Sequence, residues 1–357
     1  MNEQLNNDKY LLVGNKGVNK IQIFKFIFSD QNIMIKKENL IWESPETTAM
    51  TEVKPVTYFG KKAILSVTEN GVVIYALSDN NVLFYKEISD YSGNNIHSAC
   101  PLPDGNVVIA DSNGRIGLLI YEKGKKKQPF NETQWFRLTY AHAVVYDQIN
   151  ERIYAGGYTS INEYSYHVIA GKASLRLETT YDISDYYLRC KEYNICNEDG
   201  YWEDGIHDMY PVYGDHSQLF FLSTGERVFL FDSSTLTHSE GSKVTLDKFN
   251  PFYEIDSQKS KEAAIIAQEE KIILKKGGVK SISGNINVND FFVVAHSAPW
   301  FTDKINYSYN GNRLIYSTHI NDILDFDLTD KNKVDFDSSL NMSFYKARLI
   351  DKNWIAF

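Results

Sequence analysis

Residues 96–121, IHSACPLPDGNVVIADSNGRIGLLIY, read as three short strands separated by two polar turns. Ile116, Leu118 and Ile120 alternate with smaller or polar residues, which is the pattern of a strand whose two faces have different environments. The sequences PDGN and SNG between the apolar stretches are typical hairpin turns. The segment therefore predicts an antiparallel β-meander.

The same order of strands and turns recurs along the chain. Three further copies are AHAVVYDQINERIYAGGYTSINEYSY (141–166), IHDMYPVYGDHSQLFFLSTGERVFLFD (206–232) and VKPVTYFGKKAILSVTENGVVIYAL (53–77). Two shorter starts, VKSIS from Val279 and YKARL from Tyr345, resemble the first strand of the unit. A unit that recurs about every 45 residues is typical of a β-propeller, since a ring of four-stranded sheets leaves only short, protected edges.

The sequence thus predicts an all-β fold, a single β-propeller over residues 1–357 with six four-stranded blades, and seven blades as the alternative. The carboxyl end FYKARLIDKNWIAF supplies an inner strand, and the amino end KYLLVGNKGVNKIQIFKF supplies later strands. We therefore expect one blade to be shared by both ends, which closes the ring. Residues 186–205 and 247–278 interrupt the period and are expected to be insertions at the rim.

Composition limits the function. The chain has 24 Tyr, 20 Phe and only 8 Pro, as in ordered strand-rich proteins. A net charge of −9 disfavours nucleic-acid binding. No long apolar segment or export signal is visible, so we expect no membrane association and a monomer that is either cytoplasmic or a trimmed secreted or periplasmic form. Cys100 is expected to be buried, whereas for Cys190 and Cys196 free thiols and a disulfide remain alternatives.

The first strand of each propeller blade faces the central channel, so one repeat position is brought around one axis. That position is basic in every unit: Lys54, His97, His142, His207, Lys280 and Lys346, with Arg348 two residues further on. Because like charges in a channel repel, an anion is expected to balance them. We predict a small acidic carbohydrate or related anion as ligand, bound by these residues and by Trp300, with Glu52 and Asp208 as alternative internal counter-charges.

Two kinds of chemistry fit this ring. If it is catalytic, His207, His142 and Lys280 are the candidates for proton transfer beside a carboxylate, as in a lyase or an epimerase. Alternatively His97, His142 and His207 could hold a divalent metal such as Mn, Zn or Ca, although the lysines oppose a cation. A rival from another class is a non-catalytic scaffold that binds proteins through rim residues such as Tyr193 and Trp202.

The set AHAVVYDQINERIYAGG, HDMYPVYGDHSQLFFLSTGERVFLFD, GVKSIS and FYKARL resembles an uncharacterised bacterial family of six-bladed WD40-like propellers, classed as a domain of unknown function. The resemblance covers most of the chain from Glu52 onward and implies the fold and the channel positions. A looser, architectural likeness is to oligogalacturonate lyases of the propeller type. It implies His97, His142 and His207 as metal ligands, with Lys280 or Lys346 as a base or as the group that holds a carboxylate.

Overall fold

Strands dominate the computed structural model of the chain. It describes residues 8–27, 33–45, 47, 50–68, 71–88, 94–125, 134–183, 205–212, 219–224, 228–233, 244–245, 279–285, 290–295, 313–317, 333–350 and 354. Short 3-10 turns occur at Lys37–Asn39 and Ser338–Leu340. Within these ranges, no helix has the length and apolar character needed to cross a membrane.

The two sheets predicted from residues 53–77 and 96–121 are antiparallel meanders of four strands. The first contains β5 (Met50–Tyr58), β6 (Lys61–Thr68), β7 (Gly71–Ala76) and β8 (Val82–Glu87). The second contains β9 (Ile96–Pro101), β10 (Val107–Asp111), β11 (Arg115–Leu119) and β12 (Gln134–Arg137). In both, strands that follow one another in sequence are hydrogen-bonded neighbours.

The next three sheets vary this plan. One consists of β13 (Ala143–Asp147), β14 (Arg152–Gly156), β15 (Ser160–Ile169) and β16 (Lys172–Asp182), with β20 (Val244–Thr245) parallel to β16. Another has, in its described part, β17 (Ile206–Pro211), β18 (Leu219–Thr224) and β19 (Val228–Asp232). The third consists of β21 (Val279–Asn285), β22 (Asp290–Ala295), β23 (Arg313–Ser317), β24 (Lys333–Phe336) and β3 (Ile33–Ile35), which runs parallel to β24.

The remaining sheet joins the two ends of the chain. Its order is β25 (Ala347–Ile350), β1 (Asp8–Asn15), β2 (Lys20–Ile27) and β4 (Leu40–Glu43). The last strand lies antiparallel to the first, with Arg348 opposite Leu12 and Ile350 opposite Tyr10. The inner strand of this sheet thus comes from the carboxyl end and its other strands from the amino end.

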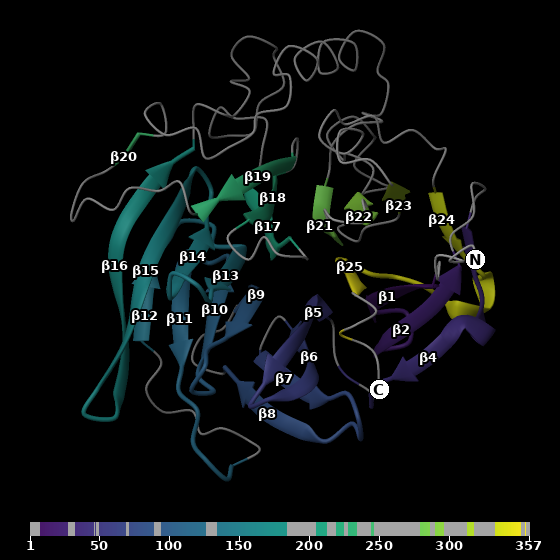
Figure 1. Cartoon of the computed structure of the whole chain (residues 1–357), viewed down its shortest axis with the longest axis horizontal. Coiled ribbons are helices and arrows are strands. Elements are labelled where there is room, and N and C mark those ends of the chain that lie inside the picture. The colour runs from purple at the N-terminus through teal and green to yellow at the C-terminus, as the bar shows by residue number, and fades with distance from the viewer. Residues whose placement is uncertain are drawn as a thin grey trace, which may run out of the picture.

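The sheets surround a common centre (Figure 1). The first strands β5, β9, β13, β17, β21 and β25 lie nearest that centre, and each contacts the next one in this order, while β25 also contacts β5. Apolar side chains fill the space between adjoining sheets; Leu65 and Ile74, for example, pack in one cluster with Ile96 and Ile109. The described part of the chain is therefore all-β and propeller-like, and its inner strands bring distant segments together.

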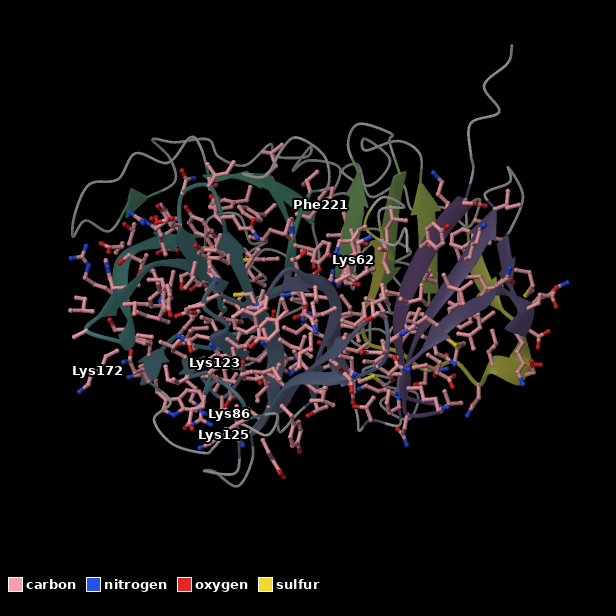
Figure 2. The ribbon with its side chains drawn as sticks, turned by 60° about the horizontal axis from the view of Figure 1, so that its bottom comes forward. Lys62, Lys86, Lys123, Lys125, Lys172 and Phe221 are labelled. Carbon is pink, nitrogen blue, oxygen red and sulfur yellow. The ribbon has the colours of Figure 1, made fainter. Side chains whose placement is uncertain are left out.

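Three lysines in turns lie at the periphery of the described structure. Lys123 and Lys125 are exposed in the turn after β11, and Lys172 is exposed where the β15–β16 hairpin turns back (Figure 2). Lys125 forms an ion pair with Glu122 three residues earlier. These lysines are solvated turn residues and take no part in the central site.

Candidate functional site

A β-bulge recurs near the start of four inner strands. Pairing with the second strand of the sheet skips one residue in each of β5, β9, β17 and β21. The skipped residues are Thr51, His97, His207 and Lys280. Because a bulge leaves one residue out of the ladder and redirects its side chain, these four positions are structurally equivalent.

Hydrogen bonds between inner strands extend this equivalence to the two remaining inner strands, β13 and β25. The residue after each bulge accepts a hydrogen bond from a backbone N–H of the next inner strand, as Glu52 does from Ala99 and Asp208 does from Ile282, both at 3.2 Å. Ser98 accepts from Val144, and Ser281 accepts from Ala347. In this register the positions equivalent to the bulge are His142 and Tyr345. We call the set Thr51, His97, His142, His207, Lys280 and Tyr345 the imidazole layer.

Three imidazoles of this layer contact one another. The rings of His97 and His142 are stacked with centroids 4.0 Å apart, and His207 meets His142 edge to face at 5.5 Å. The ring of Tyr140 also stacks on that of His142, with centroids 4.0 Å apart. The backbone carbonyl oxygen of Tyr140 lies 3.2 Å from His142 Nδ1. Four rings are thus packed together: one from β9, one from β17 and two from the segment directly before β13.

Lys280 and Tyr345 complete the layer. Lys280 Nζ lies 3.1 Å from Nε2 of His207 and 5.5 Å from the centre of the Tyr345 ring. Tyr345 in turn lies 5.6 Å from the His97 ring. The ammonium group therefore faces both an imidazole nitrogen and an aromatic ring, two environments that stabilise a cation.

The buried imidazoles of His97 and His142 are neutral at physiological pH. Burial lowers the pKa of His97 well below its ordinary value of 6.5, and Lys346, His207, Lys280 and Lys16 lower it further in that order. Burial also lowers the pKa of His142, to which His97 and His207 add. A neutral imidazole has one donor and one acceptor nitrogen, so His97 and His142 offer hydrogen bonds without adding charge to the layer.

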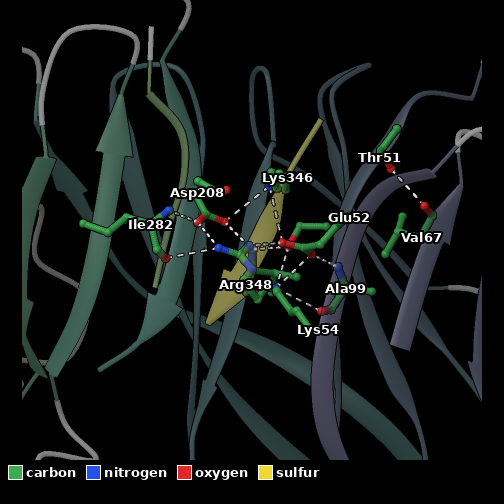
Figure 3. Close-up of polar contacts among 12 residues, drawn as sticks. Thr51, Glu52, Lys54, Val67, Ala99, Asp208, Ile282, Lys346 and Arg348 are labelled. Atoms are coloured by element: carbon green, nitrogen blue, oxygen red, sulfur yellow. Dashed lines mark hydrogen bonds and ion pairs between the residues drawn. The ribbon is translucent and has the colours of Figure 1, made fainter. Parts of the chain in front are cut away.

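A second group of charged side chains lies beside it, which we call the ionic layer: Glu52, Lys54, Asp208, Lys346 and Arg348 (Figure 3). Lys346 Nζ lies 3.3 Å from both Glu52 Oε1 and Asp208 Oδ1. Arg348 donates to both oxygens of Asp208 and, at 2.8 Å, to Glu52 Oε1.

Lys54 completes the ionic layer. Its ammonium lies 2.9 Å from Glu52 Oε2 and donates to Ser98 Oγ and to the carbonyls of Ala99 and Val144. Strands β5, β17 and β25 are therefore joined by ion pairs whose side chains are almost inaccessible to solvent, while Lys54 also ties β5 to β9 and β13.

The ionic layer carries a surplus of positive charge. It contains three basic groups and two carboxylates, so its formal charge is one positive unit. Burial alone would raise the pKa of Asp208, but Arg348 and Lys346 outweigh it and lower that pKa to about 2. Burial likewise opposes ionisation of Glu52, and Lys346 and Lys54 overcome it, so this pKa is also lowered. Both carboxylates are charged. Burial lowers the pKa of Lys54, which Glu52 opposes, and the formal surplus counts Lys54 in its protonated form.

These positions refine the predicted alignment of the repeats. His97, His142, His207 and Lys280 are equivalent, as predicted, but Lys54 lies three residues after the bulge at Thr51. Lys346 follows Tyr345, the residue that occupies the equivalent place. Lys54, Lys346 and Arg348 lie near the centre, where Glu52 and Asp208 neutralise them in part. The internal counter-charges considered from sequence are thus present.

The structure does not arrange the predicted metal ligands as a metal site. A metal ion accepts the lone pair of an imidazole in the plane of the ring. His97 and His142 are stacked with an angle of 29° between their planes, so their lone pairs lie in separate, nearly parallel planes. Among the residues that the structure describes, no three His, Cys, Asp or Glu side chains form a group that could hold a metal ion. The proposed cage of His97, His142 and His207 is therefore corrected to a stacked cluster.

Several predicted features lie outside the described residues. These are Trp300, Cys190, Cys196, the insertion at 247–278 and all of the insertion at 186–205 except Gly205. Cys100 is described, and it is buried with a free thiol, as predicted.

Comparison with known proteins places the chain in a family. A model described as a family of unknown function (DUF6528) matches residues 46–250, more than half of the chain. The chain belongs to this family. The description of the family names no activity. The predicted resemblance to an uncharacterised family is therefore confirmed, and membership assigns no role to any residue. No curated protein matches the sequence.

A solved structure shows similarity of fold. The crystal structure of a protein of unknown function from Bacteroides caccae has a TM-score of 0.51 and 12% identity, and the match covers 97% of this chain and 100% of that chain. The crystal structure of a nidogen/laminin complex matches with a TM-score of 0.47 and 10% identity over 96% of this chain and 98% of that chain. At such low identity, similarity concerns the fold alone.

Proposed function

We propose that the DUF6528 chain forms a closed propeller of six blades whose imidazole layer binds a small acidic carbohydrate or a related anion. The contact of β25 with β5, which returns the series of inner strands to its start, supports a closed ring. The observation that carries the ligand class is the charge of the centre. Lys280 lies beside an ionic layer that already has one surplus positive charge, and the imidazoles of His97 and His142 are neutral.

The roles of the basic residues differ in this proposal. Lys280 faces the ligand directly, whereas Lys54, Lys346 and Arg348 are held by Glu52 and Asp208 and contribute a positive potential. In a medium of low dielectric constant such a potential reaches farther than it does in water. The neutral imidazoles and the ring of Tyr345 supply hydrogen bonds and an apolar face, as sugar rings require.

The proposal extends to acid–base chemistry at His207. Lys280 Nζ lies 3.1 Å from Nε2 and 3.4 Å from Nδ1 of this ring, so the ammonium is close to whichever nitrogen carries the lone pair. With a uronate, the ammonium of Lys280 turns from the ring to the carboxylate, and the lone-pair nitrogen that it leaves takes the proton from the carbon next to that carboxylate, while Lys280 stabilises the charge that develops there. Such a step begins both β-elimination and epimerisation.

A thermal-shift screen tests the binding proposal. Uronic acids, sialic acid and sugar phosphates should raise the unfolding temperature, while the matching neutral sugars should not, because a ligand that binds only the folded chain stabilises it by mass action. Lys280→Gln should abolish the shift. The control is Lys25→Gln, which removes an exposed lysine that pairs with Asp8 on the β1–β2 hairpin. If no acid stabilises the unaltered chain, the proposal is wrong.

Exposed apolar residues favour a second candidate, the protein scaffold. Val168 is 52% exposed and Ile169 72% exposed at the end of β15, and Leu177 on the paired strand β16 is 48% exposed. A pull-down with the chain and with an Ile169→Asp variant tests it: a partner that is lost only in the variant would favour the scaffold. A partner that binds both equally would count against this surface.

A further inference from the structure

The turn between β12 and β13 brings both a ring and a carbonyl oxygen of Tyr140 to His142. The φ of Tyr140 is 55°, in the left-handed region that bulky side chains rarely adopt. Its ring stacks on the imidazole of His142, and its carbonyl oxygen lies 3.2 Å from Nδ1 of the same imidazole. This backbone conformation costs free energy in a residue with a Cβ, so the contacts around the turn must hold it.

Contacts on both sides of Tyr140 hold the turn. The carbonyl of Thr139 accepts a hydrogen bond from the N–H of Tyr158 at 2.9 Å, and the rings of Tyr140 and Tyr158 meet edge to face with centroids 6.1 Å apart. After the turn, the N–H of His142 donates to the carbonyl of Gly156 at 3.0 Å. The turn is thus fixed to β14 and to the segment that follows β14.

The carbonyl of Tyr140 determines which nitrogen of His142 carries the proton. A carbonyl oxygen can only accept, so a hydrogen bond with it requires the proton on Nδ1. The ring is neutral, since burial holds its pKa well below 6.5, and it therefore has a single N–H. The lone pair then lies on Nε2, which makes no hydrogen bond to any residue that the structure describes.

We propose that Tyr140 is a positioning residue whose left-handed turn fixes His142 in the Nδ1–H form, so that this ring meets the ligand as a hydrogen-bond acceptor at Nε2 and not as a donor. The inference rests on the proposed function and adds a specificity to it. A carboxylate has no proton to donate to Nε2, so the ligand must offer a hydroxyl group here in addition to its acidic group. A sugar acid has both groups, and an acid without hydroxyls leaves Nε2 unpaired.

His167 in β15 provides a reference for the tautomer within the same chain. Its Nε2 lies 2.8 Å from Ser165 Oγ, and the hydroxyl of Ser165 donates its own proton to the carboxylate of Glu178. Because that proton is already used, Ser165 Oγ accepts from Nε2–H of the neutral ring, and the lone pair of His167 lies on Nδ1. His142 and His167 should therefore show opposite tautomers.

Long-range proton–nitrogen NMR of the chain with isotope-labelled histidine tests this at about pH 8.5, where an ordinary imidazole is neutral. The nitrogen without a proton resonates at the higher frequency, and Nε2 is recognised because it couples to both ring protons through two bonds. His142→Asn and His167→Asn assign the signals. We expect the lone pair on Nε2 of His142 and on Nδ1 of His167. A lone pair on Nδ1 of His142 would overturn the proposal.

Two substitutions of Tyr140 separate the turn from the ring. Asn tolerates the left-handed conformation, whereas the β-branched Val strongly disfavours it. Tyr140→Asn should therefore keep the Nδ1–H form of His142, and Tyr140→Val should lose it, while the signals of His167 stay unchanged in both. Because both variants remove the ring stack, a difference between them reports on the backbone. If Tyr140→Val keeps the Nδ1–H form, the turn does not set the tautomer and the proposal is wrong.

Titration calorimetry with D-glucuronate tests the role of Nε2 toward the ligand. His142→Asn keeps an N–H donor near the place of Nδ1 and removes Nε2, so it should weaken binding about tenfold, the effect of one hydrogen bond. His167→Asn is the matched control and should leave the affinity unchanged. Cyclohexanecarboxylate, which has the same charge and ring size but no hydroxyls, should bind more weakly than D-glucuronate to the unaltered chain; equal affinities would contradict recognition of a hydroxyl.

The outcomes separate this inference from the proposed function. If His142→Asn binds D-glucuronate as well as the unaltered chain does, the role of Nε2 is wrong and the proposed function stands. If the unaltered chain binds neither D-glucuronate nor any other acid of the thermal-shift screen, the proposed function fails, and the role of Nε2 toward a ligand fails with it, whichever tautomer the NMR spectrum shows.

Discussion

The Arg348 guanidinium holds the Asp208 carboxylate at two points, with Nη2 2.7 Å from Oδ1 and Nη1 on Oδ2. The pair joins β25 to β17 across 140 residues of sequence, and both side chains are fully buried. Arg348→Met should therefore lower the free energy of unfolding by about 3–5 kcal/mol, because it leaves Asp208 charged and without its main partner. Urea denaturation followed by far-ultraviolet circular dichroism measures this loss.

A conservative variant separates geometry from charge. Arg348→Lys keeps the positive charge but cannot donate along two parallel directions, so it should recover only part of the stability. Lys25→Gln, which breaks an exposed ion pair, should leave the unfolding midpoint unchanged. An Arg348→Met chain as stable as the original would show that the ionic layer does not stabilise the fold.

Stability should fall when the pH drops below about 6.5. Burial holds the pKa of His97 and of His142 below the value of 6.5 that they regain on unfolding. Below pH 6.5 the two histidines bind protons in the unfolded chain but not in the folded chain, so acid favours unfolding. The stability that the neutral histidines contribute is complete only above pH 6.5. Each pKa unit of difference corresponds to about 1.4 kcal/mol.

Urea titrations at several pH values check this dependence. His97→Gln removes one of the two groups and should flatten the slope below pH 6.5, whereas the carboxylates Glu52 and Asp208 act only at lower pH, since their pKa values are lowered. A stability that does not change between neutral pH and pH 5.5 would be inconsistent with neutral, buried imidazoles.

Gly156→Ala should destabilise the contact between two neighbouring sheets. A Cβ at this position in β14 would lie 2.6 Å from Cγ2 and 3.0 Å from Cδ1 of Ile206 in β17. Overpacking of this kind costs about 1–3 kcal/mol. In combination with Ile206→Ala, the loss should be smaller than the sum of the two single losses, because the clash is removed; strictly additive losses would argue against this packing.

The Cys100 thiol should resist modification in the folded chain. It is 6% exposed, and burial raises its pKa to about 12, so almost none of the reactive thiolate is present at neutral pH. Labelling with N-ethylmaleimide, followed by peptide mass mapping, should leave Cys100 unmodified until urea is added. Rapid labelling of Cys100 without denaturant would mean that its strand opens readily.

Much of the fold could be predicted because each repeat keeps its own turns and its own alternating strands. The register of the channel was harder to predict. The bulge adds one residue to four of the inner strands, and at two of the six equivalent positions the residue is Thr51 or Tyr345 rather than a histidine or a lysine. Because the predicted equivalence followed the basic residues, it selected Lys54 and Lys346. Lys54 lies three residues beyond the equivalent position Thr51, and Lys346 lies one residue beyond Tyr345.

The contributions of other segments could not be inferred from the repeats. Lys16 lies in a turn between two strands that are far in sequence from the histidines, and only the pairing of β1 with β25 brings it to the centre. Glu52 and Asp208 were identified as counter-charges because each adjoins a channel position in sequence. Their shared contact with Arg348 depends on the distance between β5 and β17 across the channel, which no local pattern specifies.

The pairing of β1 with β25 has a consequence for biosynthesis. Strand β1 is synthesised long before β25, the inner strand with which it pairs, and β3 must likewise wait for β24. Until then the nascent chain exposes an unsatisfied strand edge, which favours aggregation and recruitment of chaperones. Because Ile350 lies opposite Tyr10, a short linker between these ends, with new termini at the Ala170–Gly171 turn, would make the pairing local and speed folding.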